Sequence, residues 1–454
     1  MDRAALASKF EVMKKLNEIA GSIVAPRGFR ASGVFCDIKR LGTGKGSDKG
    51  DKRDLALIMS DVPAAVAGAF TTNQTCAAPV KICIERVRRG RAQVIVANSG
   101  NANACTGKQG FKDALEMARF TERALALPPG LALVGSTGRI GLALPMDNIR
   151  SGIIEAAVEL GSTPRHGDQA MEAIMTSDTR PKQMALEFTL AGQSTRLGGI
   201  CKGAGMIQPG MSLTGKRPAA APLHATMLCF ITTDAAIEPK PLQTALEQAV
   251  ANGFNRISVD GDMSTNDTVL VLANGLANPK SKIRNPASRD FGVFQAALSH
   301  LCLELAKMIV RDGEGVSRFV TIRVKGARSF AHADAAARAV ANSALVKTSW
   351  HGGDPNWGRI IAALGSSPAT IVEPKVDIGY SAPGSRQILW SLKRGQPTPA
   401  AFTDLCAAVA PKEFDLHIHL NLGRAEALFY AADLTEAYVQ FNKGDVSDPA
   451  SLGG

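Results

Sequence analysis

Apolar segments of strand length alternate with amphipathic segments of helical length along the whole chain. The segments 93–100 and 131–141 begin as continuous apolar runs and end in small polar residues, a pattern typical of buried strands that lead into turns. Between them, the segment 112–127 repeats its apolar residues with helical spacing. The pattern therefore predicts a strand, a helix and a second strand in this part of the chain.

The same alternation continues toward the C-terminus without a fixed period. It predicts helices at 151–161, 168–175, 241–254 and about 289–310, and strands at 268–275 and 318–327. The segment 183–206 is expected to form a hairpin followed by a loop, and 415–442 the strands of a C-terminal sheet. Because the regular βαβ spacing of a doubly wound parallel sheet is missing, we predict a mixed α/β (α+β) fold.

The composition is that of a globular protein. The chain has 454 residues, of which 45% are hydrophobic, and this length is typical of two or three domains or pseudo-domains. No uninterrupted apolar run reaches the ~18 residues of a membrane span, and the segment 1–28 lacks the apolar core of a signal peptide. We therefore expect a cytoplasmic protein with no membrane partner and a short amphipathic helix at its N-terminus.

Cysteine spacing and charge exclude several further classes of protein. The eight cysteines contain no Cys-x-x-Cys pair, which predicts reduced, mostly buried thiols rather than disulfides or a zinc site. The net charge of +11 is compatible with an anionic substrate, but the basic residues are dispersed. Since no recognised nucleic-acid-binding module accompanies the charge, we expect no nucleic-acid partner.

Two short motifs have the appearance of ligand sites. The glycine-rich stretch 42–46 contains a lysine but lacks the spacing of a phosphate-binding loop and a strand before it, so it is interpreted as a loop. His417 and His419 would project from one face of a strand, as a metal-binding pair requires. No third ligand is evident beside them, and the sequence predicts two ordinary histidines and no metal site.

Several turns carry more chemically active groups than a turn requires. Thr137 and Gly138 follow an apolar strand, where a hydroxyl and a backbone N–H can point at one spot and stabilise an oxyanion. Glu314 lies between glycines after a predicted helix. Further polar turns are expected at 97–107, 255–268 and 352–360. Each of these is typical of a turn by itself, but their combination favours a catalytic site.

The bond between Ala225 and Thr226 lies at the mouth of a strongly apolar segment, 226–231. A glycine-rich loop that carries Lys202 lies about twenty residues upstream. By itself this arrangement is typical of a loop that enters a core strand.

Together these segments resemble the ornithine acetyltransferase family, the bifunctional glutamate N-acetyltransferases of arginine biosynthesis. The resemblance covers nearly the whole chain, and its most specific motifs are Lys-Gly-x-Gly-Met-Ile at 202–207, Ala-Thr-Met-Leu at 225–228 and Val-Asp-Gly-Asp at 259–262. It implies a layered αββα-type fold with mixed sheets, of the self-cleaving N-terminal-nucleophile kind. Cleavage between Ala225 and Thr226 would give an α chain of residues 1–225 and a β chain of residues 226–454.

The resemblance also implies a role for individual residues. Thr226 would be the nucleophile, with Thr137 and Gly138 as its oxyanion hole. The implied substrate contacts are Thr176, Lys202, Thr226, Glu314, Asn442 and Ser447. The implied reaction moves acetyl from N-acetylornithine to glutamate through acetyl-Thr226, without a cofactor, although acetyl-CoA is a possible second donor. The implied assembly is an α2β2 heterotetramer.

The chain departs from the family pattern in three places. Residues 212–224 are inserted before the Ala-Thr bond, Ser447 stands where the family has threonine and is followed by a further tail, and the N-terminal helix and the 42–53 segment are additional. Two other functions stay open. Water could discharge acyl-Thr226, which would make the chain an amidohydrolase or aminopeptidase, or the chain could be an uncleaved, non-catalytic relative.

Overall fold

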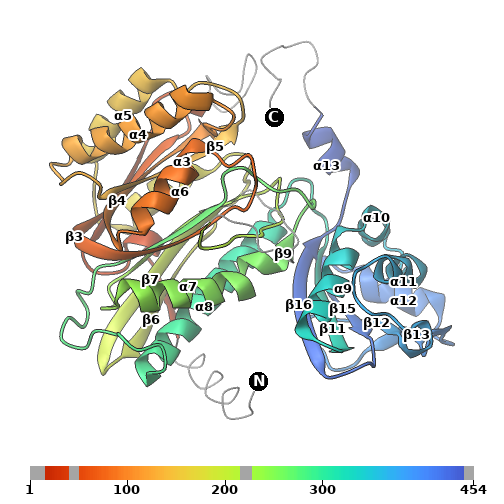
Figure 1. The fold of residues 1–454 in the computed structure, drawn as a ribbon. Coiled ribbons are helices and arrows are strands. Elements are labelled where there is room, and N and C mark those ends of the chain that lie inside the picture. Colours follow the sequence, from red (N-terminus) through yellow and green to blue (C-terminus); the bar gives the residue numbers. More distant parts are fainter. Residues whose placement is uncertain (1–15, 40–50, 215–226, 444–454) are drawn as a thin grey trace. The chain divides into compact units, whose positions relative to one another are not determined.

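The computed structural model describes residues 16–39, 51–214 and 227–443 (Figure 1). The chain forms two compact units, which are described separately. Within the described residues, the first unit comprises the chain up to 255 together with 262–309, and the second comprises 256–261 and the chain from 310 onward. The segment 255–268, predicted as one polar loop, is therefore shared between the units, and it contains the short strand β9 (Ile257–Ser258).

The N-terminal helix prediction is wrong where the structure describes this segment. Asn17–Ile19 form strand β1, which pairs with strand β6 (Gln183–Leu190), and Ser22–Val24 form a 3-10 turn. As a strand, this segment forms backbone hydrogen bonds with strand β6, and these bonds stabilise it in the extended conformation. Residues 1–15 and the motif at 42–46 lie outside the described residues.

The strands of the first unit form one mixed sheet. Its other strands are β2 (Phe29–Val34), β3 (Leu55–Phe70), β4 (Arg91–Asn101), β5 (Ala132–Arg139), β7 (Gln193–Lys202), β8 (Leu228–Thr233) and β10 (Thr268–Ala273). The order is β1-β6-β7-β8-β10-β3-β4-β5, with β2 also paired to β3. The pairs β8–β10 and β4–β5 are parallel, whereas β6–β7 is the predicted hairpin.

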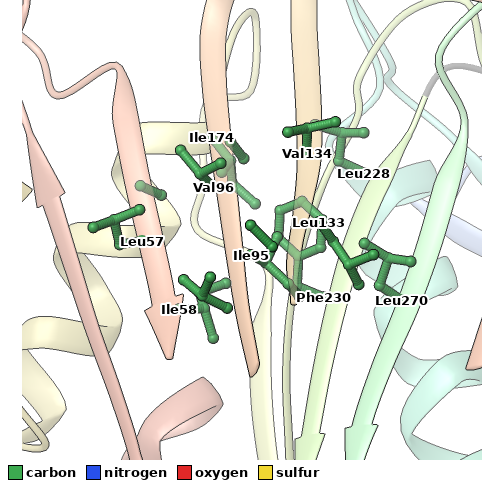
Figure 2. Close-up of a cluster of buried hydrophobic side chains, with 14 of the residues drawn as sticks. Leu57, Ile58, Ile95, Val96, Leu133, Val134, Ile174, Leu228, Phe230 and Leu270 are labelled. Atoms are coloured by element: carbon green, nitrogen blue, oxygen red, sulfur yellow. The ribbon is translucent and has the colours of Figure 1, made fainter. Parts of the chain in front are cut away.

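The sheet folds over on itself, so that two layers of strands pack face to face. The register of β3 against β4 is irregular between Met59 and Ala64, at the point where β3 passes from its pairing with β2 to its pairing with β10. Across the layers, a Cβ on Gly135 of β5 would lie only 3.1 Å from Cζ of Phe230 of β8, although these strands are not neighbours in the sheet. Figure 2 shows part of the surrounding apolar core, with side chains from β3, β4, β5, β8 and β10.

Helices cover the outer face of each layer. They are α3 (Ala78–Val87), α4 (Gly107–Ala124), α5 (Met146–Val158) and α6 (Pro164–Ile174), which pack on the β2–β5 layer, and α7 (Pro239–Asn252) and α8 (Arg289–Arg311), which pack on the other layer. Strands buried on both faces consist of continuous apolar residues, which explains their sequence pattern. The predicted layered αββα-type fold with mixed sheets is confirmed.

Helix α8 is long and apolar enough to cross a membrane by length and composition alone. In the fold it is a core helix, because Leu301 and Leu305 would each lie 3.0 Å from a Cβ on Gly199 of β7. Both leucines are fully buried.

The second unit is a mixed sheet with helices. The sheet order is β14 (Gln396–Pro397), β13 (Leu389–Lys393), β12 (Asp377–Ser381), β15 (Glu413–His419), β11 (Phe319–Ala327), β16 (Ala425–Ala432) and β9. Its helices are α9 (Phe330–Asn342), α10 (Ala344–His351), α11 (Trp357–Gly365), α12 (Phe402–Val409) and α13 (Glu436–Phe441). Trp350, Tyr380 and Phe414 meet edge to face in its core.

Two sequence predictions for the second unit need correction. The last part of the segment 415–442 is not a strand, because Thr435 caps the helix α13 by accepting a hydrogen bond from the Tyr438 N–H. The predicted turn at 352–360 contains the start of helix α11 instead, where the Asn356 side chain accepts from the Arg359 N–H.

Two predicted turns of the first unit are strand. β4 continues to Asn101, and β5 continues through Thr137 and Gly138 to Arg139, so that Gly100 lies opposite Gly138. Both glycines have positive φ, 100° and 127°, and a Cβ on Gly138 would lie 2.3 Å from the carbonyl carbon of Gly100. The strands can approach and pair at this point because neither residue has a side chain.

The predicted burial of most cysteines is confirmed. All eight cysteines are free thiols, most of them buried and only Cys105 exposed.

Candidate active site

The predicted nucleophile itself lies outside the described residues, as do Ala225 and Ser447. The description resumes at Met227, which is fully buried and leads directly into β8. β8 lies between β7 and β10, and Lys202, the last residue of β7, is paired with Leu228. The end of β7 and the start of β8 are thus adjacent, which places Lys202 beside Leu228, two residues after Thr226 in the sequence.

Lys202 and Thr137 are in contact, although they are 65 residues apart in the sequence. The Lys202 ammonium donates a hydrogen bond to Thr137 Oγ1 over 3.3 Å, and the two residues are 2% and 1% exposed. Because the threonine oxygen accepts from lysine, its own O–H can donate to another group. A hydrogen bond from a charged donor also strengthens the bond that the acceptor then donates. This arrangement suits a donor to an oxyanion.

Thr137 is held in place from behind by a buried amide network. The Asn266 side chain donates to the carbonyl oxygens of Ser136 (2.8 Å) and Ala102 (2.7 Å). The Ser136 hydroxyl donates to Asn98 Oδ1 over 2.6 Å. These bonds connect the end of β5 with the loop before β10, so the strand end that carries Thr137 and Gly138 is rigid.

A substrate can use Thr137 and Gly138 only if this strand end is accessible from solvent. Gly138 is exposed, whereas its neighbours Thr137 and Arg139 are buried. The two groups of the predicted oxyanion hole therefore differ in exposure. The Thr137 hydroxyl is buried, whereas the Gly138 backbone lies at the surface.

Asp178 connects two of the predicted substrate residues. Its Oδ2 accepts from the Thr176 N–H (2.9 Å), and its Oδ1 accepts from the Gly203 N–H (2.7 Å), directly after Lys202. The same Oδ1 accepts from the ammonium of Lys182 at 2.6 Å, and the side chains of this pair are 0% and 1% exposed. Thr176, Lys202 and Thr137 are thus brought together from three separate segments.

Asp178, Lys182 and Lys202 together carry a net positive charge. Burial alone would raise the pKa of Asp178, but the charges of Lys202 and Lys182 and the Gly203 N–H outweigh burial and hold this pKa well below its ordinary value. One carboxylate thus interacts with two buried ammonium groups, and these three groups together have an excess of one positive charge. A substrate carboxylate would neutralise that excess.

Asp178→Asn is expected to destabilise the protein by about 3 kcal/mol at neutral pH, because it removes the buried carboxylate that pairs with the Lys182 ammonium and attracts the Lys202 ammonium. A carboxyl with a depressed folded-state pKa stabilises the fold above its unfolded pKa of about 3.9, and the stabilisation is lost as the pH falls through the folded-state value. The difference between the variant and the wild type should therefore shrink below about pH 4.

Urea unfolding at a fixed protein concentration measures this difference. Asp168→Asn is the matched control, because Asp168 is an exposed carboxylate that accepts a hydrogen bond from the neutral Gln183 side chain. Equal unfolding midpoints for Asp178→Asn and the wild type at neutral pH would show that Asp178 does not balance the lysines.

Glu314 and Asn442 lie in the second unit and contact each other. The Asn442 side chain donates to Glu314 Oε2 over 3.0 Å. The neighbouring loop is held by Thr435, whose hydroxyl donates to the Gly315 carbonyl oxygen at 2.6 Å. A Cβ on Gly315 would lie 2.3 Å from the Tyr438 nitrogen, so helix α13 packs directly on the glutamate loop. Two of the substrate contacts implied by the resemblance, Glu314 and Asn442, therefore lie side by side in the second unit.

The histidine pair is not a metal site within the described residues, where no group of three or more His, Cys, Asp or Glu side chains is placed to hold an ion. His417 is 4% exposed and its Nε2 lies 2.9 Å from Ser381 Oγ. Burial lowers the pKa of His417 to about 4, so the ring is neutral at physiological pH. The prediction of ordinary histidines fits this geometry.

Sequence reasoning did not assign a role to Asp178, Lys182 or Asp267. Asp178 and Lys182 lie in the segment Thr-Ser-Asp-Thr-Arg-Pro-Lys at 176–182, and Asp267 lies in the predicted polar turn 255–268. The only sign of these residues in the sequence is that each is a charged residue inside a motif. Their burial and their pairing become apparent only in the folded chain.

Comparison with known proteins decides the family. The ArgJ family model matches residues 30–444. The chain belongs to the ArgJ family. A relative from Symbiobacterium thermophilum, named arginine biosynthesis bifunctional protein ArgJ, is 45% identical over 427 residues, which cover 93% of this chain and 98% of the relative. A glutamate N-acetyltransferase from Methanocaldococcus jannaschii is 41% identical over 429 residues, with the same coverage of 93% and 98%.

A solved structure of the family also matches. The ornithine acetyltransferase from Mycobacterium tuberculosis, in complex with ornithine, is 36% identical and covers 43% of this chain and 100% of its own, with a TM-score of 0.39. The resemblance predicted from the sequence is confirmed by the family match, and so is the prediction that this ArgJ-family chain is an acyltransferase.

Proposed function

We propose that the protein transfers the acetyl group of N-acetylornithine to glutamate, giving ornithine and N-acetylglutamate in arginine biosynthesis. The observation that carries this proposal is the contact between Lys202 and Thr137 beside the start of β8. It combines an oxyanion donor with a buried positive charge, beside the strand that in the sequence follows the residue assigned as nucleophile by the family motif. The relatives' names point to the same chemistry.

In the proposed first half-reaction, the Thr226 hydroxyl oxygen attacks the acetyl carbonyl carbon. The α-amine of Thr226 takes the hydroxyl proton and passes it to the departing nitrogen, so that a C–O bond forms, a C–N bond breaks and ornithine leaves. Thr137 and Gly138 stabilise the oxyanion of the tetrahedral intermediate. The amine of glutamate then attacks acetyl-Thr226, and the same steps run in reverse.

The substrate contacts follow from charge. Lys202 suits the carboxylate that both amino acids share, because its cluster has an excess positive charge. Glu314, hydrogen-bonded to Asn442, suits an amine, and Thr176 and Ser447 complete the proposed set. We assign no cofactor, and acetyl-CoA stays a possible second donor.

The active form would be a cleaved one. Self-cleavage between Ala225 and Thr226 would free the α-amine that serves as the base. The chains of residues 1–225 and 226–454 would pair as an α2β2 heterotetramer in the cytoplasm.

Incubation with N-acetylornithine alone is expected to add one acetyl mass to the 226–454 chain. Ornithine must leave before glutamate can use the same site, so double-reciprocal plots with both substrates varied should give parallel lines. Rapid quench followed by intact mass measurement, together with initial rates, tests both points.

Two results would contradict this proposal. Intersecting lines without an acetylated chain would mean direct transfer. Loss of acetyl to water at the same rate with and without glutamate would mean that the protein is an amidohydrolase, the alternative that the sequence leaves open.

A further inference from the structure

Asp433 is a buried acid of the second unit that connects the end of β16 with the segment that follows Glu314. Its Oδ1 accepts hydrogen bonds from the N–H groups of Ser317 and Arg318, over 2.9 and 3.0 Å. Its Oδ2 accepts from the Ser317 hydroxyl. The backbone is paired at the same place, since the Asp433 N–H donates to the Arg318 carbonyl oxygen over 3.2 Å. One carboxyl group thus accepts three hydrogen bonds from the two residues that lead into β11.

These bonds hold the turn that carries Glu314. Glu314 lies three residues before Ser317, and Gly315 between them is held by the Thr435 hydroxyl, which donates to its carbonyl oxygen over 2.6 Å. Asp433 and Thr435 belong to one short segment between β16 and α13. This segment therefore fixes the chain at two points directly after Glu314.

The same segment sets the position of Asn442. Asp433 lies just before α13, and Asn442 directly follows the end of this helix. Because α13 has only six residues, the position of its start determines the position of its end. The Asn442 side chain donates to Glu314 Oε2 over 3.0 Å. Asp433 thus acts on both members of the Glu314–Asn442 pair.

A buried lysine compensates the burial of Asp433. The Lys347 ammonium of α10 donates to the carbonyl oxygen of Ala432, directly before Asp433, and Lys347 is buried. Burial lowers the pKa of Lys347 to about 8, whereas the charges of Asp260 and Asp433 raise it. His351 Nδ1 lies 3.6 Å from Asp433 Oδ2. The carboxyl group is therefore held by charge as well as by hydrogen bonds.

We propose that Asp433 is a positioning residue for substrate recognition, which orients the Glu314 carboxylate toward the substrate amine by fixing the Glu314 turn and the start of α13. The proposal rests on the proposed function, which assigns Glu314 to an amine. The hydrogen bond from Asn442 uses only part of the acceptor capacity of the Glu314 carboxylate, and the rest can accept from the amine. A carboxylate that is already oriented loses little conformational freedom when the substrate binds, so Asp433 should affect KM rather than kcat.

A double-mutant cycle tests whether Asp433 acts through Glu314. Glu314→Gln removes the negative charge and should raise KM for N-acetylornithine about thirtyfold, the loss typical of a hydrogen bond to a charged group. The double variant should have the KM of Glu314→Gln alone, because Asp433 can no longer position a carboxylate that is absent.

The single variant Asp433→Asn is expected to raise this KM about tenfold and to keep kcat within about twofold of the wild type. Its amide oxygen can still accept from the two N–H groups. It lacks the second accepting oxygen for the Ser317 hydroxyl and the negative charge beside Lys347, so the turn should lose its fixed orientation. Steady-state rates with saturating glutamate measure both constants.

Asp415→Asn is the matched control. Asp415 is also a buried carboxyl group of the second sheet, but it accepts from the Gly384 N–H over 2.9 Å and from Arg323 Nε over 2.8 Å. It is not bonded to the Glu314 turn, so KM should stay within about twofold of the wild type.

Multiplied effects in the double variant would overturn the proposal, because Asp433 would then act independently of Glu314. An unchanged KM in Asp433→Asn or in Glu314→Gln would overturn it as well. If Asp433→Asn does not fold, Ser317→Ala replaces it in the cycle and should raise KM about threefold, since it removes one neutral donor to Asp433. An unchanged KM in Ser317→Ala, or multiplied effects with Glu314→Gln, would then overturn the proposal. Absence of acetyl transfer in the wild type would refute the proposed function, and the role of Asp433 with it.

Discussion

Thr226→Ala is expected to leave one uncut chain of 454 residues without transferase activity. The side chain of alanine has no hydroxyl, so it can attack neither the Ala225 carbonyl in self-cleavage nor the acetyl group in transfer. The wild type should instead give chains of residues 1–225 and 226–454 by intact mass.

The wild-type chains should copurify under native conditions. β8 and β10, which follow the cut, lie in the sheet between β7 and β3, which precede it. Breaking the Ala225–Thr226 bond removes none of the backbone hydrogen bonds in these pairs.

Two variants control for a general loss of folding. Thr226→Ser keeps a hydroxyl and should still be cleaved. Thr232→Ala lies on the same strand and loses the hydrogen bond from Thr232 to the Ile23 carbonyl oxygen, but it should be cut normally. A wild-type protein that is uncut and fully active would refute the role of Thr226.

The sequence pattern located most helices and strands of the first unit. β8 and β10 are apolar on both faces, because one face meets the opposite strand layer and the other meets helices. Such segments appear in the sequence as continuous apolar runs. The sequence pattern did not predict the order of the strands in the sheet, because β3 pairs with β2, β4 and β10 along its length.

The failures occurred where tertiary pairing overrides local preference. Asn-Ser-Gly-Asn at 98–101 and Ser-Thr-Gly at 136–138 have turn composition, yet they pair with each other as strands. The close approach of Gly100 and Gly138 permits this pairing. Helix α13 was missed for a different reason, since its cap residue Thr435 comes only three residues after the end of β16 and was included in the strand segment.

The candidate site was found through motifs rather than through geometry. Thr137 and Lys202 could be named from the sequence, but their contact depends on two strand layers that face each other. Asp178 and Asp267 could not be assigned at all, because what distinguishes them is burial beside specific partners. The burial and the charged neighbours of these two carboxyl groups arise only when the chain folds.

Thr137→Val is expected to lower kcat roughly 10²-fold with little change in KM, the loss typical of one missing oxyanion donor. Valine has nearly the same shape as threonine, so the packing of this buried position should be retained. The lost hydroxyl acts on the oxyanion of the tetrahedral intermediate rather than on the bound substrate, and therefore the effect belongs in kcat. Steady-state rates with N-acetylornithine and glutamate, on protein shown to be fully cleaved, measure it.

Thr137→Ser is the control that separates the hydroxyl from the methyl group. Serine keeps the oxygen that accepts from Lys202 and the O–H that donates to the oxyanion, so its kcat should stay close to that of the wild type. Valine also leaves the Lys202 ammonium without this acceptor, and a displaced lysine would raise KM as well. A large rise in KM with unchanged kcat would therefore assign Thr137 to holding Lys202 in place. A kcat within about threefold of the wild type, with unchanged KM, would leave Thr137 as a structural residue of β5.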